Sequence, residues 1–449
     1  MHVLGVGPGV GSAVGRGKAL IDSVAEAPLV FSGIVPGSET SLQDLAGVRV
    51  TDCKTPTRRK ASFAVDNLIA SAQTDAGIND AAWLDDEPLR RLSGSLDRDG
   101  PLSGMGRNRA SRMLVETLVK RLRVQSYLER FPEIQARALD RPIALVGPPR
   151  TGTTFLHRLL SKDPANRTPR LWEVLQAPPL EPRLRDDPRY FSADSRVEVL
   201  REHLASRARF LPKMQRIHAT SVDAPEECFG LLESSLLSHS FMVYGPAWSY
   251  LEWLSDLPDD RWQAVYRLYA DQLRILDWFA SARRWVVKTP FHLWAMGALS
   301  EALPGLFFVQ LHRSPVTCAA SFASLMVEAY KPIAPKVPVP VIGRFALDYL
   351  RQAVQRAARA RVALPSGQVL DIQYSELVAD PMGQVRRIYD AAGLQLEPEA
   401  ERAMIAWLAD PGAGGARGRH DYELAEYGLG VDEVDEAFAP YEALASHAR

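Results

Sequence analysis

The sequence predicts an α/β protein in which a parallel β-sheet is flanked by helices and carries a helical cap. Short apolar runs, typical of strands buried on both faces, occur at 142–146, 285–288, 306–311 and 368–372. Segments with helical periodicity separate these runs. Several of them fall between about 175 and 280, ahead of the second run, and form the predicted cap.

The composition is that of a globular protein with almost no net charge, so any charged site must be a local cluster. The chain has 449 residues, 46% hydrophobic and 24% charged, and its 53 basic and 54 acidic residues nearly cancel. This balance argues against nucleic acid as a partner. Without a long apolar run there is no transmembrane segment to predict, so we expect a soluble, cytoplasmic protein.

Cysteine usage points to the same compartment. Cys53, Cys228 and Cys318 are an odd number and lack a C-x-x-C spacing, which argues against disulfides and a zinc site. We expect all three to be small buried side chains. The histidines are scattered without ligand spacing, so no metal is predicted.

Residues 1–60 differ from the remainder of the chain. They are rich in glycine and are predicted to be an N-terminal extension of unknown role, followed by one domain at 61–449. Gly5-x-Gly7 resembles the start of a dinucleotide-binding turn, but the strand before it is too short.

Helices follow in order along the main domain. The pattern predicts helices over 61–77 and 107–131, with a loop or short helix at 88–92. The basic residues of the second helix, Lys120, Arg121 and Arg123, are interpreted as a solvated face. Further helices are predicted over 196–210, 225–240, 261–280, 291–303 and 315–328.

The loop at 147–154 is the strongest functional signal. It reads Gly-Pro-Pro-Arg-Thr-Gly-Thr-Thr and joins the first apolar run to a predicted helix, whose apolar residues are Phe155, Leu156, Leu159 and Leu160. Backbone N–H groups and the helix dipole at such a junction favour an anion. The spacing of Gly147 and Gly152 is that of a nucleotide P-loop, but Thr153 stands where the lysine is needed. A smaller anion than a triphosphate is indicated, although a glycine turn of purely structural purpose is the alternative.

Cations also end two other predicted strands. Arg150 follows the first, Lys288 ends the second and Arg313 ends the third. Ligands of parallel sheets bind at the carboxyl ends of strands, so these three side chains predict a polyanion site.

Two motifs resemble those of sulfotransferases that use 3′-phosphoadenosine 5′-phosphosulfate (PAPS). The loop matches the 5′-phosphosulfate motif P-R-[ST]-G-T-T, and Arg313 with Ser321 matches the 3′-phosphate motif. The resemblance extends over about 70–449 and implies the P-loop-like sulfotransferase fold, with PAPS as co-substrate and 3′,5′-adenosine bisphosphate (PAP) as product. The residues that it implies for nucleotide binding are Arg150, Thr151, Gly152, Thr153, Thr154, Arg313, Ser321 and, more loosely, Arg417 and Arg419.

The resemblance also implies catalytic roles. Lys288 and Arg150 stabilise the leaving phosphate, and His292 or Glu173 removes the proton of the acceptor. His292 could instead be a core or capping residue, and Glu173 a partner of a nearby arginine. Glu226 and Glu227 rank third, because acidic residues at a helix start are favoured whatever the function.

The expected reaction is transfer of a sulfuryl group to a hydroxyl of a small-molecule, lipid or secondary-metabolite acceptor. The acceptor is expected against the cap, whose aromatic residues either line a pocket or form core; they are Phe229, Phe241, Tyr244, Trp248, Tyr250 and Trp253. A nucleotide kinase with a degenerate P-loop and a non-catalytic nucleotide-binding module are the alternatives. A homodimer is left open.

Overall fold

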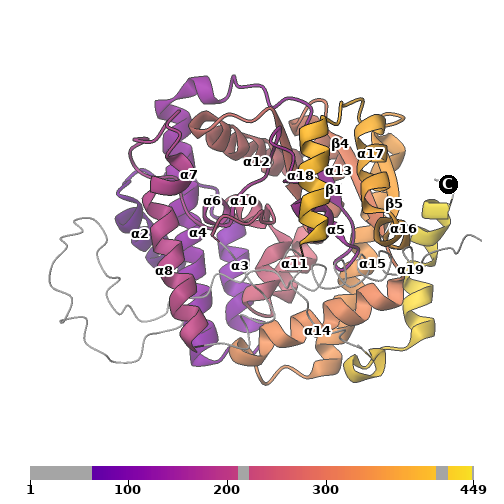
Figure 1. Ribbon diagram of the computed structural model, residues 1–449. Coiled ribbons are helices and arrows are strands. Elements are labelled where there is room, and N and C mark those ends of the chain that lie inside the picture. The colour runs from indigo at the N-terminus through magenta and orange to yellow at the C-terminus, as the bar shows by residue number, and fades with distance from the viewer. Residues whose placement is uncertain (1–62, 211–221, 411–422, 447–449) are drawn as a thin grey trace, which may run out of the picture.

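A parallel five-stranded sheet lies at the centre of the computed structural model, which describes residues 63–210, 222–410 and 423–446 (Figure 1). The strand order is β2-β3-β1-β4-β5. The strands are β1 Ile143–Val146, β2 Asn166–Arg167, β3 Arg284–Lys288, β4 Phe307–His312 and β5 Val369–Gln373. The parallel sheet and its four long strands were predicted from the apolar runs. The two-residue β2 was not, because it is too short to give a pattern.

The register of the sheet places the ends of β1, β3 and β4 level with one another. In the central strand β1, Leu145 pairs with Lys288 of β3 on one side and with Val309 of β4 on the other. The residues that follow β1, β3 and β4 therefore emerge at the same edge of the sheet. All of β1, β3 and β4 is buried, as expected for strands covered on both faces.

Helices cover the sheet and build most of the remaining mass. Before β1 lie α2 Val65–Ala76, α3 Glu87–Arg98 and α4 Gly104–Arg130. Between β1 and β3 lie α5 Thr153–Leu160, α6 Leu171–Leu175, α7 Tyr190–Ala193, α8 Ser195–Phe210, α10 Phe229–Glu233, η3 His239–Tyr244, α11 Trp248–Ser255 and α12 Asp259–Phe279. After β3 lie η4 Pro290–Trp294, α13 Met296–Ala302, α14 Pro315–Ile333, α15 Val339–Ala363, α16 Tyr374–Ala379, α17 Pro381–Ala391, α18 Pro398–Ala409, η5 Leu424–Tyr427 and α19 Val431–Ser446.

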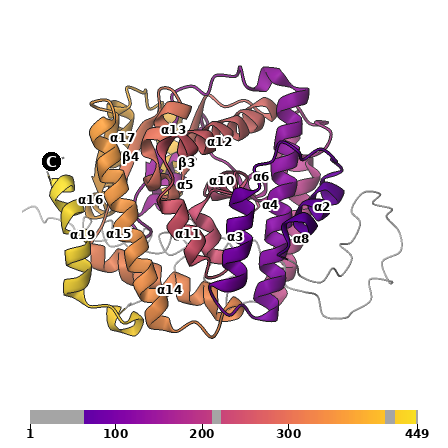
Figure 2. The ribbon, with the colours of Figure 1, turned by 180° about the vertical axis from the view of Figure 1, so that it is seen from behind.

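The two views of the ribbon place these helices on opposite sides of the sheet. Helices α2, α4 and α8 form one end of the molecule, and α16, α17 and α19 form the other (Figures 1 and 2). The longest predicted helices are confirmed with shifted ends, as α4 and α12 show. Helix α3, by contrast, is longer than the predicted loop or short turn at 88–92.

The predicted helix over 225–240 is wrong, and its residues matter for the site. Pro225 pairs with Arg170 in an isolated antiparallel bridge, so the chain is extended there. Helix α10 covers only Phe229–Glu233, and the left-handed φ of 60° at Leu236 prevents its continuation. Similarly, the predicted helix over 291–303 is interrupted at Ala295, where φ is −152°.

The predicted solvated basic face of α4 is also wrong. Lys120 is buried, and its ammonium group donates to the carbonyl oxygens of Val174 and Gly230. Burial lowers the pKa of Lys120 to about 8. Arg121 stacks on Trp83 at 4.7 Å. Helix α4 is covered on this side by the cap, which local sequence could not reveal.

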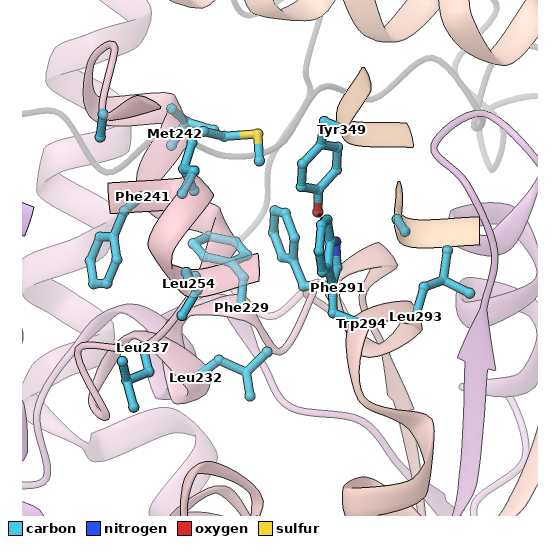
Figure 3. Close-up of a cluster of buried hydrophobic side chains, with 14 of the residues drawn as sticks. Phe229, Leu232, Leu237, Phe241, Met242, Leu254, Phe291, Leu293, Trp294 and Tyr349 are labelled. Atoms are coloured by element: carbon cyan, nitrogen blue, oxygen red, sulfur yellow. Dashed lines mark hydrogen bonds between the residues drawn. The ribbon is translucent and has the colours of Figure 1, made fainter. Parts of the chain in front are cut away.

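The aromatic residues of the cap belong to the core. Phe229, Phe241, Tyr244 and Tyr250 are buried in the main hydrophobic cluster, against which Trp248 and Trp253 pack. Figure 3 shows Phe229 and Phe241 among other buried side chains, with Phe229 next to Phe291. The core interpretation of these rings is therefore the correct one.

Two further expectations concern buried thiols and membranes. Cys228 and Cys318 are free and buried, as predicted, whereas Cys53 and the extension at 1–60 lie outside the described residues. Across the part of the chain that the structure describes, no helix is both long and apolar enough to cross a membrane.

Candidate functional site

The loop between β1 and α5 has the backbone that its glycines permit. Gly147 has a φ of 151°, and a Cβ there would lie 2.6 Å from the carbonyl oxygen of Leu311. Gly152, with a φ of 91°, is the residue before the first turn of α5. Arg150 also has a positive φ, of 76°. The loop is thus a compact turn that brings the N-terminus of α5 close to the end of β4.

Hydroxyl groups and a second arginine hold this loop. The fully buried Thr151 donates to the carbonyl oxygen of Pro148 at 2.8 Å. Arg313, directly after β4, donates to the carbonyl oxygen of Arg150 at 2.9 Å and stacks on Tyr374 at 3.9 Å. The guanidinium of Arg313 therefore contacts the backbone of the residue that carries the first predicted cation, Arg150.

Lys288 links the loop to the end of β3. Its side chain is 2% exposed, and its ammonium group donates to the hydroxyl of Thr154 at 2.9 Å. The same ammonium group forms an ion pair with Glu227. The prediction that Lys288 lies beside the anion loop is consistent with these contacts, and the carboxylate partner is new.

Ser321 lies on α14, two turns after Arg313, and is buried. Thr153, in the first turn of α5, is buried as well. Arg417 and Arg419 lie outside the described residues.

Glu173 is enclosed by protein partners. It is the third residue of α6 and accepts from the backbone N–H of Arg170 at 2.9 Å, as in a capping box. Its other oxygen accepts from Arg167 at 2.6 Å and from the hydroxyl of Tyr190 at 3.1 Å. Its side chain is 0% exposed. These contacts are those of the structural alternative, a partner of a nearby arginine.

His292 is likewise enclosed. It is 0% exposed and lies in η4, where its Nδ1 is 3.0 Å from the hydroxyl of Tyr266. Burial lowers the pKa of His292 to about 3, so the imidazole is neutral and weakly basic at neutral pH. Tyr269 packs edge-on against the same ring.

Glu226 and Glu227, which rank third among the candidate bases from the sequence, lie in a segment whose backbone is bound to Pro169 and to Lys288. The backbone N–H of Glu226 donates to the carbonyl oxygen of Pro169 at 2.9 Å, and that of Cys228 donates to the carbonyl oxygen of Lys288 at 2.9 Å. Burial, reinforced by the charge of Glu227, raises the pKa of Glu226 to about 7. The sequence ranks these two residues third because acidic residues are favoured at a helix start whatever the function; the contact of Glu227 with Lys288 joins distant segments and has no local sequence signal.

Behind Arg313 lies a polar network that the sequence also missed. His312, the last residue of β4, contacts Asp371 at 2.7 Å through Nε2 and the hydroxyl of Tyr441 at 2.7 Å through Nδ1. Arg361 binds both oxygens of Asp371, at 2.6 and 2.7 Å. The network fixes the end of β4, and with it the backbone of Arg313.

Metal ligands do not gather in the described ranges. Within 63–210, 222–410 and 423–446, no group of three or more His, Cys, Asp or Glu side chains could hold a metal ion. Lys288 and the N-terminus of α5 can bind an anion, and the carboxylate of Glu227 lies beside them.

The segment that contains the site matches a known protein family. A family model described as "Sulfotransferase family" matches residues 142–398, more than half of the chain. This range begins just before the anion loop and contains all five strands.

Among characterised relatives, omega-hydroxy-beta-dihydromenaquinone-9 sulfotransferase Stf3 of Mycobacterium bovis is 26% identical over 311 residues, which is 66% of this chain and 73% of that protein. Among solved structures, sulfotransferase STF1 from Mycobacterium tuberculosis is 32% identical with a TM-score of 0.74, over 85% of this chain and 100% of that one. Sulfotransferase STF9 from Mycobacterium avium is 26% identical with a TM-score of 0.75, over 86% and 98% of the two chains.

Proposed function

This chain belongs to the sulfotransferase family, and on that premise we propose that it transfers the sulfuryl group of PAPS to a hydroxyl, releasing PAP. The observation that carries the choice of donor is that two strand-end cations contact the loop: Lys288 donates to the hydroxyl of Thr154, and Arg313 donates to the backbone carbonyl of Arg150. A donor with phosphates at both ends of a ribose matches two separate cationic positions on one sheet edge.

The residues present fit such a donor. The loop at 147–154 supplies a helix N-terminus, hydroxyls and Arg150 for the 5′-phosphosulfate. Arg313 and Ser321, from the end of β4 and from α14, are suited to the 3′-phosphate. Arg417 and Arg419 stay predictions for the nucleotide.

Charge stabilisation is the main catalytic contribution that we assign. Cleavage of the bond between sulfur and the bridging oxygen leaves negative charge on the 5′-phosphate. Lys288 and Arg150 are the proposed cations for that charge, and preorganised cations in a dry site are effective because they need little reorganisation. Lys288 is largely shielded from water, which strengthens its interaction with an anion.

For the acceptor we propose a hydroxyl on an apolar molecule, either a lipid or a secondary metabolite. Support comes from the relative of Mycobacterium bovis, whose name specifies an omega-hydroxylated lipid quinone. At 26% identity this relationship favours a class of acceptor and not a particular compound.

The donor assignment is tested by ligand-induced stabilisation. The melting temperature of the purified protein is measured with PAP, and separately with ATP and magnesium, for the wild type, Arg313→Ala and the matched control Arg386→Ala. Arg386 pairs with Glu401 on the surface, far along the chain from the loop. A ligand present at a hundred times its dissociation constant stabilises the folded state by about 2.7 kcal/mol, a readily measured shift.

PAP should stabilise the wild type and the Arg386→Ala control, and should lose most of its effect on Arg313→Ala. Stabilisation by ATP with magnesium alone would instead favour the kinase alternative. If PAP has no effect on the wild type, the proposed donor is wrong.

A further inference from the structure

The segment that carries Glu227 is fixed to the end of β3. Cys228 donates its backbone N–H to the carbonyl oxygen of Lys288 at 2.9 Å, and the backbone N–H of Lys288 contacts the sulfur of Cys228 at 3.4 Å. On its other side, Glu226 is bound to the backbone of Pro169 at 2.9 Å. Glu227 is therefore held between two backbone contacts, which gives its carboxylate a defined position beside the strand end.

Lys288 lies between Glu227 and the anion loop and contacts both. The ammonium group of Lys288 contacts Oε1 of Glu227 and, at 2.9 Å, the hydroxyl of Thr154. Thr154 belongs to the first turn of α5, where the proposed phosphosulfate binds. A single cation thus separates a carboxylate from the place where sulfuryl transfer occurs.

The second oxygen of this carboxylate is available for a hydrogen bond. Oε2 of Glu227 is buried and has no hydrogen-bond partner among the described residues. Buried carboxylate oxygens normally accept a hydrogen bond, so we expect Oε2 to accept one from a donor outside the described residues. The hydroxyl of an acceptor is such a donor.

The exposed fraction of its side chain distinguishes Glu227 from Glu173 and His292, the two bases that the sequence favours. The side chain of Glu227 is 13% exposed, whereas those of Glu173 and His292 are 0% exposed. Both oxygens of Glu173 already accept from protein donors. Oε2 of Glu227 accepts from no described donor, so an acceptor hydroxyl can bind there while the ion pair through Oε1 stays intact.

We propose that Glu227 is the general base of the transfer and that Lys288 holds it in place; this inference rests on the function proposed above. The acceptor oxygen forms a bond to sulfur while the bond from sulfur to the bridging oxygen of the 5′-phosphate breaks. The electron pair of the broken bond stays on the bridging oxygen, beside Lys288. The hydroxyl proton passes to Oε2 of Glu227 and then to solvent, so nothing is oxidised or reduced.

The neighbouring charges support this assignment. The charged or titratable groups near the site include Glu226, Lys288, Arg158 and His157, and burial lowers the pKa of His157 to about 3. Burial raises the pKa of Glu226 to about 7, so this neighbour is mostly neutral below that pH. Lys288 contacts Oε1 of Glu227, which leaves Oε2 to accept the proton.

The test compares Glu227→Gln and Glu227→Asp with Glu401→Gln, a surface glutamate paired with Arg386. PAP binding is followed by thermal shift. Transfer is followed with ³⁵S-labelled PAPS and three probes: 1-dodecanol, 2-naphthol and water. Glu227→Gln should bind PAP at least as tightly as the wild type, because loss of the carboxylate leaves Lys288 free for the anion.

Transfer by Glu227→Gln should fall by about 100-fold or more, the usual contribution of a general base. The acidic limb of the pH profile of kcat/KM should vanish in Glu227→Gln, and Glu227→Asp should retain it at a lower rate. Glu401→Gln should behave as the wild type in both assays.

The inference fails if Glu227→Gln keeps the rate and the acidic limb of the wild type, or if that limb vanishes only in Glu173→Gln or His292→Asn. It also fails if Glu227→Gln loses PAP binding, which is the result for a residue that only positions Lys288. A wild type that binds PAP but transfers to none of the probes, water included, overturns the proposed function and this inference with it. A wild type that transfers normally together with an active Glu227→Gln overturns the inference alone.

Discussion

Lys288 connects the two sides of the site at the scale of single residues. It is a largely buried cation whose ammonium group contacts a threonine of the anion loop and a carboxylate of the cap. An ion pair shielded in this way adds little stability relative to an apolar pair of the same shape, but removing one partner is costly because the other charge remains. The ion pair therefore contributes more to the site than to stability, and a substitution that removes only one of the two charges should destabilise the fold.

Replacing Lys288 with methionine should lower the free energy of unfolding by about 3–5 kcal/mol, because it leaves the Glu227 carboxylate mostly buried without its cation. The double variant Lys288→Met/Glu227→Gln should recover most of this loss. Urea unfolding of the two single variants and the double variant gives the coupling energy. Strictly additive losses would show that the two side chains do not stabilise each other.

Glu226 makes stability depend on pH in an unusual direction. Its pKa is about 7 in the folded protein, against an ordinary value of 4.5, so the folded state binds more protons than the unfolded state between these values. The free energy of unfolding should therefore decrease as the pH rises from about 4.5 to about 7.

Glu226→Gln should remove this dependence. The variant is expected to match the wild type near pH 4.5 and to exceed its stability at pH 8 by up to about 3 kcal/mol, at 1.36 kcal/mol per pKa unit. Glutamine keeps the oxygen that accepts from the backbone N–H of Glu227. Urea midpoints from pH 4.5 to pH 8 measure the difference, with Glu401→Gln as the surface control. Parallel curves for the wild type and Glu226→Gln would show that Glu226 has an ordinary pKa.

At the scale of elements, the contact between α6 and α10 positions the segment that carries Glu227. A Cβ on Gly230 would lie 2.5 Å from the carbonyl oxygen of Val174, so only glycine permits this approach. Lys120 binds the same two helices from α4, through the carbonyl oxygens of Val174 and Gly230. The close approach at Gly230 and the hydrogen bonds of Lys120 both involve backbone groups of α6 and α10. They therefore position these helices without using the side chains of the site.

Gly230→Ala should destabilise the protein by about 1–3 kcal/mol, because the added methyl group forces α6 and α10 apart. Gly297→Ala is a matched control: this glycine is also helical, in α13, and no atom lies within 4 Å of the methyl group it would gain. The control should gain up to about 1 kcal/mol from helix propensity. Chemical denaturation of both variants checks the contrast, and equal effects would contradict the close contact.

At the scale of the whole molecule, the end of the chain returns to the sheet. Tyr441 of α19 contacts His312 of β4 at 2.7 Å and Gln310 at 3.1 Å. Arg361 of α15 and Asp371 of β5 complete the network from the other side. Four elements, β4, α15, β5 and α19, thus meet behind Arg313, which couples the fold of the C-terminal region to the edge of the sheet where β4 ends.

The carboxylate of this network should contribute to acid stability. Burial alone would raise the pKa of Asp371, but hydrogen bonds from Arg361 and His312 lower it to about 2. Its contribution is fully present above its ordinary value of 3.8 and is lost as the pH falls toward about 2.

Asp371→Asn should be less stable than the wild type at pH 7, and the difference should shrink as the pH falls from about 4 to about 2. Urea midpoints across this range measure it. Asp390→Asn, at an exposed position near the end of α17, serves as control and should follow the wild type. A constant difference at every pH would mean that Asp371 is not ionised in the native network.

The sequence by itself determined the parallel sheet, the loop into α5 and the three cations at strand ends. These features are local: apolar runs specify buried strands, and a glycine-rich turn with Arg150 and threonines predicts an anion loop. The continuous periodicity of α15, which went unused, was equally available in the sequence.

Only the tertiary structure decided the surroundings of each charge. Lys120 was interpreted as solvated but is buried, Glu173 is enclosed by Arg167 and Tyr190, and Glu227 meets Lys288 from 61 residues away. The physical reason is that burial, ion pairing and the resulting pKa values depend on contacts between elements distant in sequence, which no local pattern encodes.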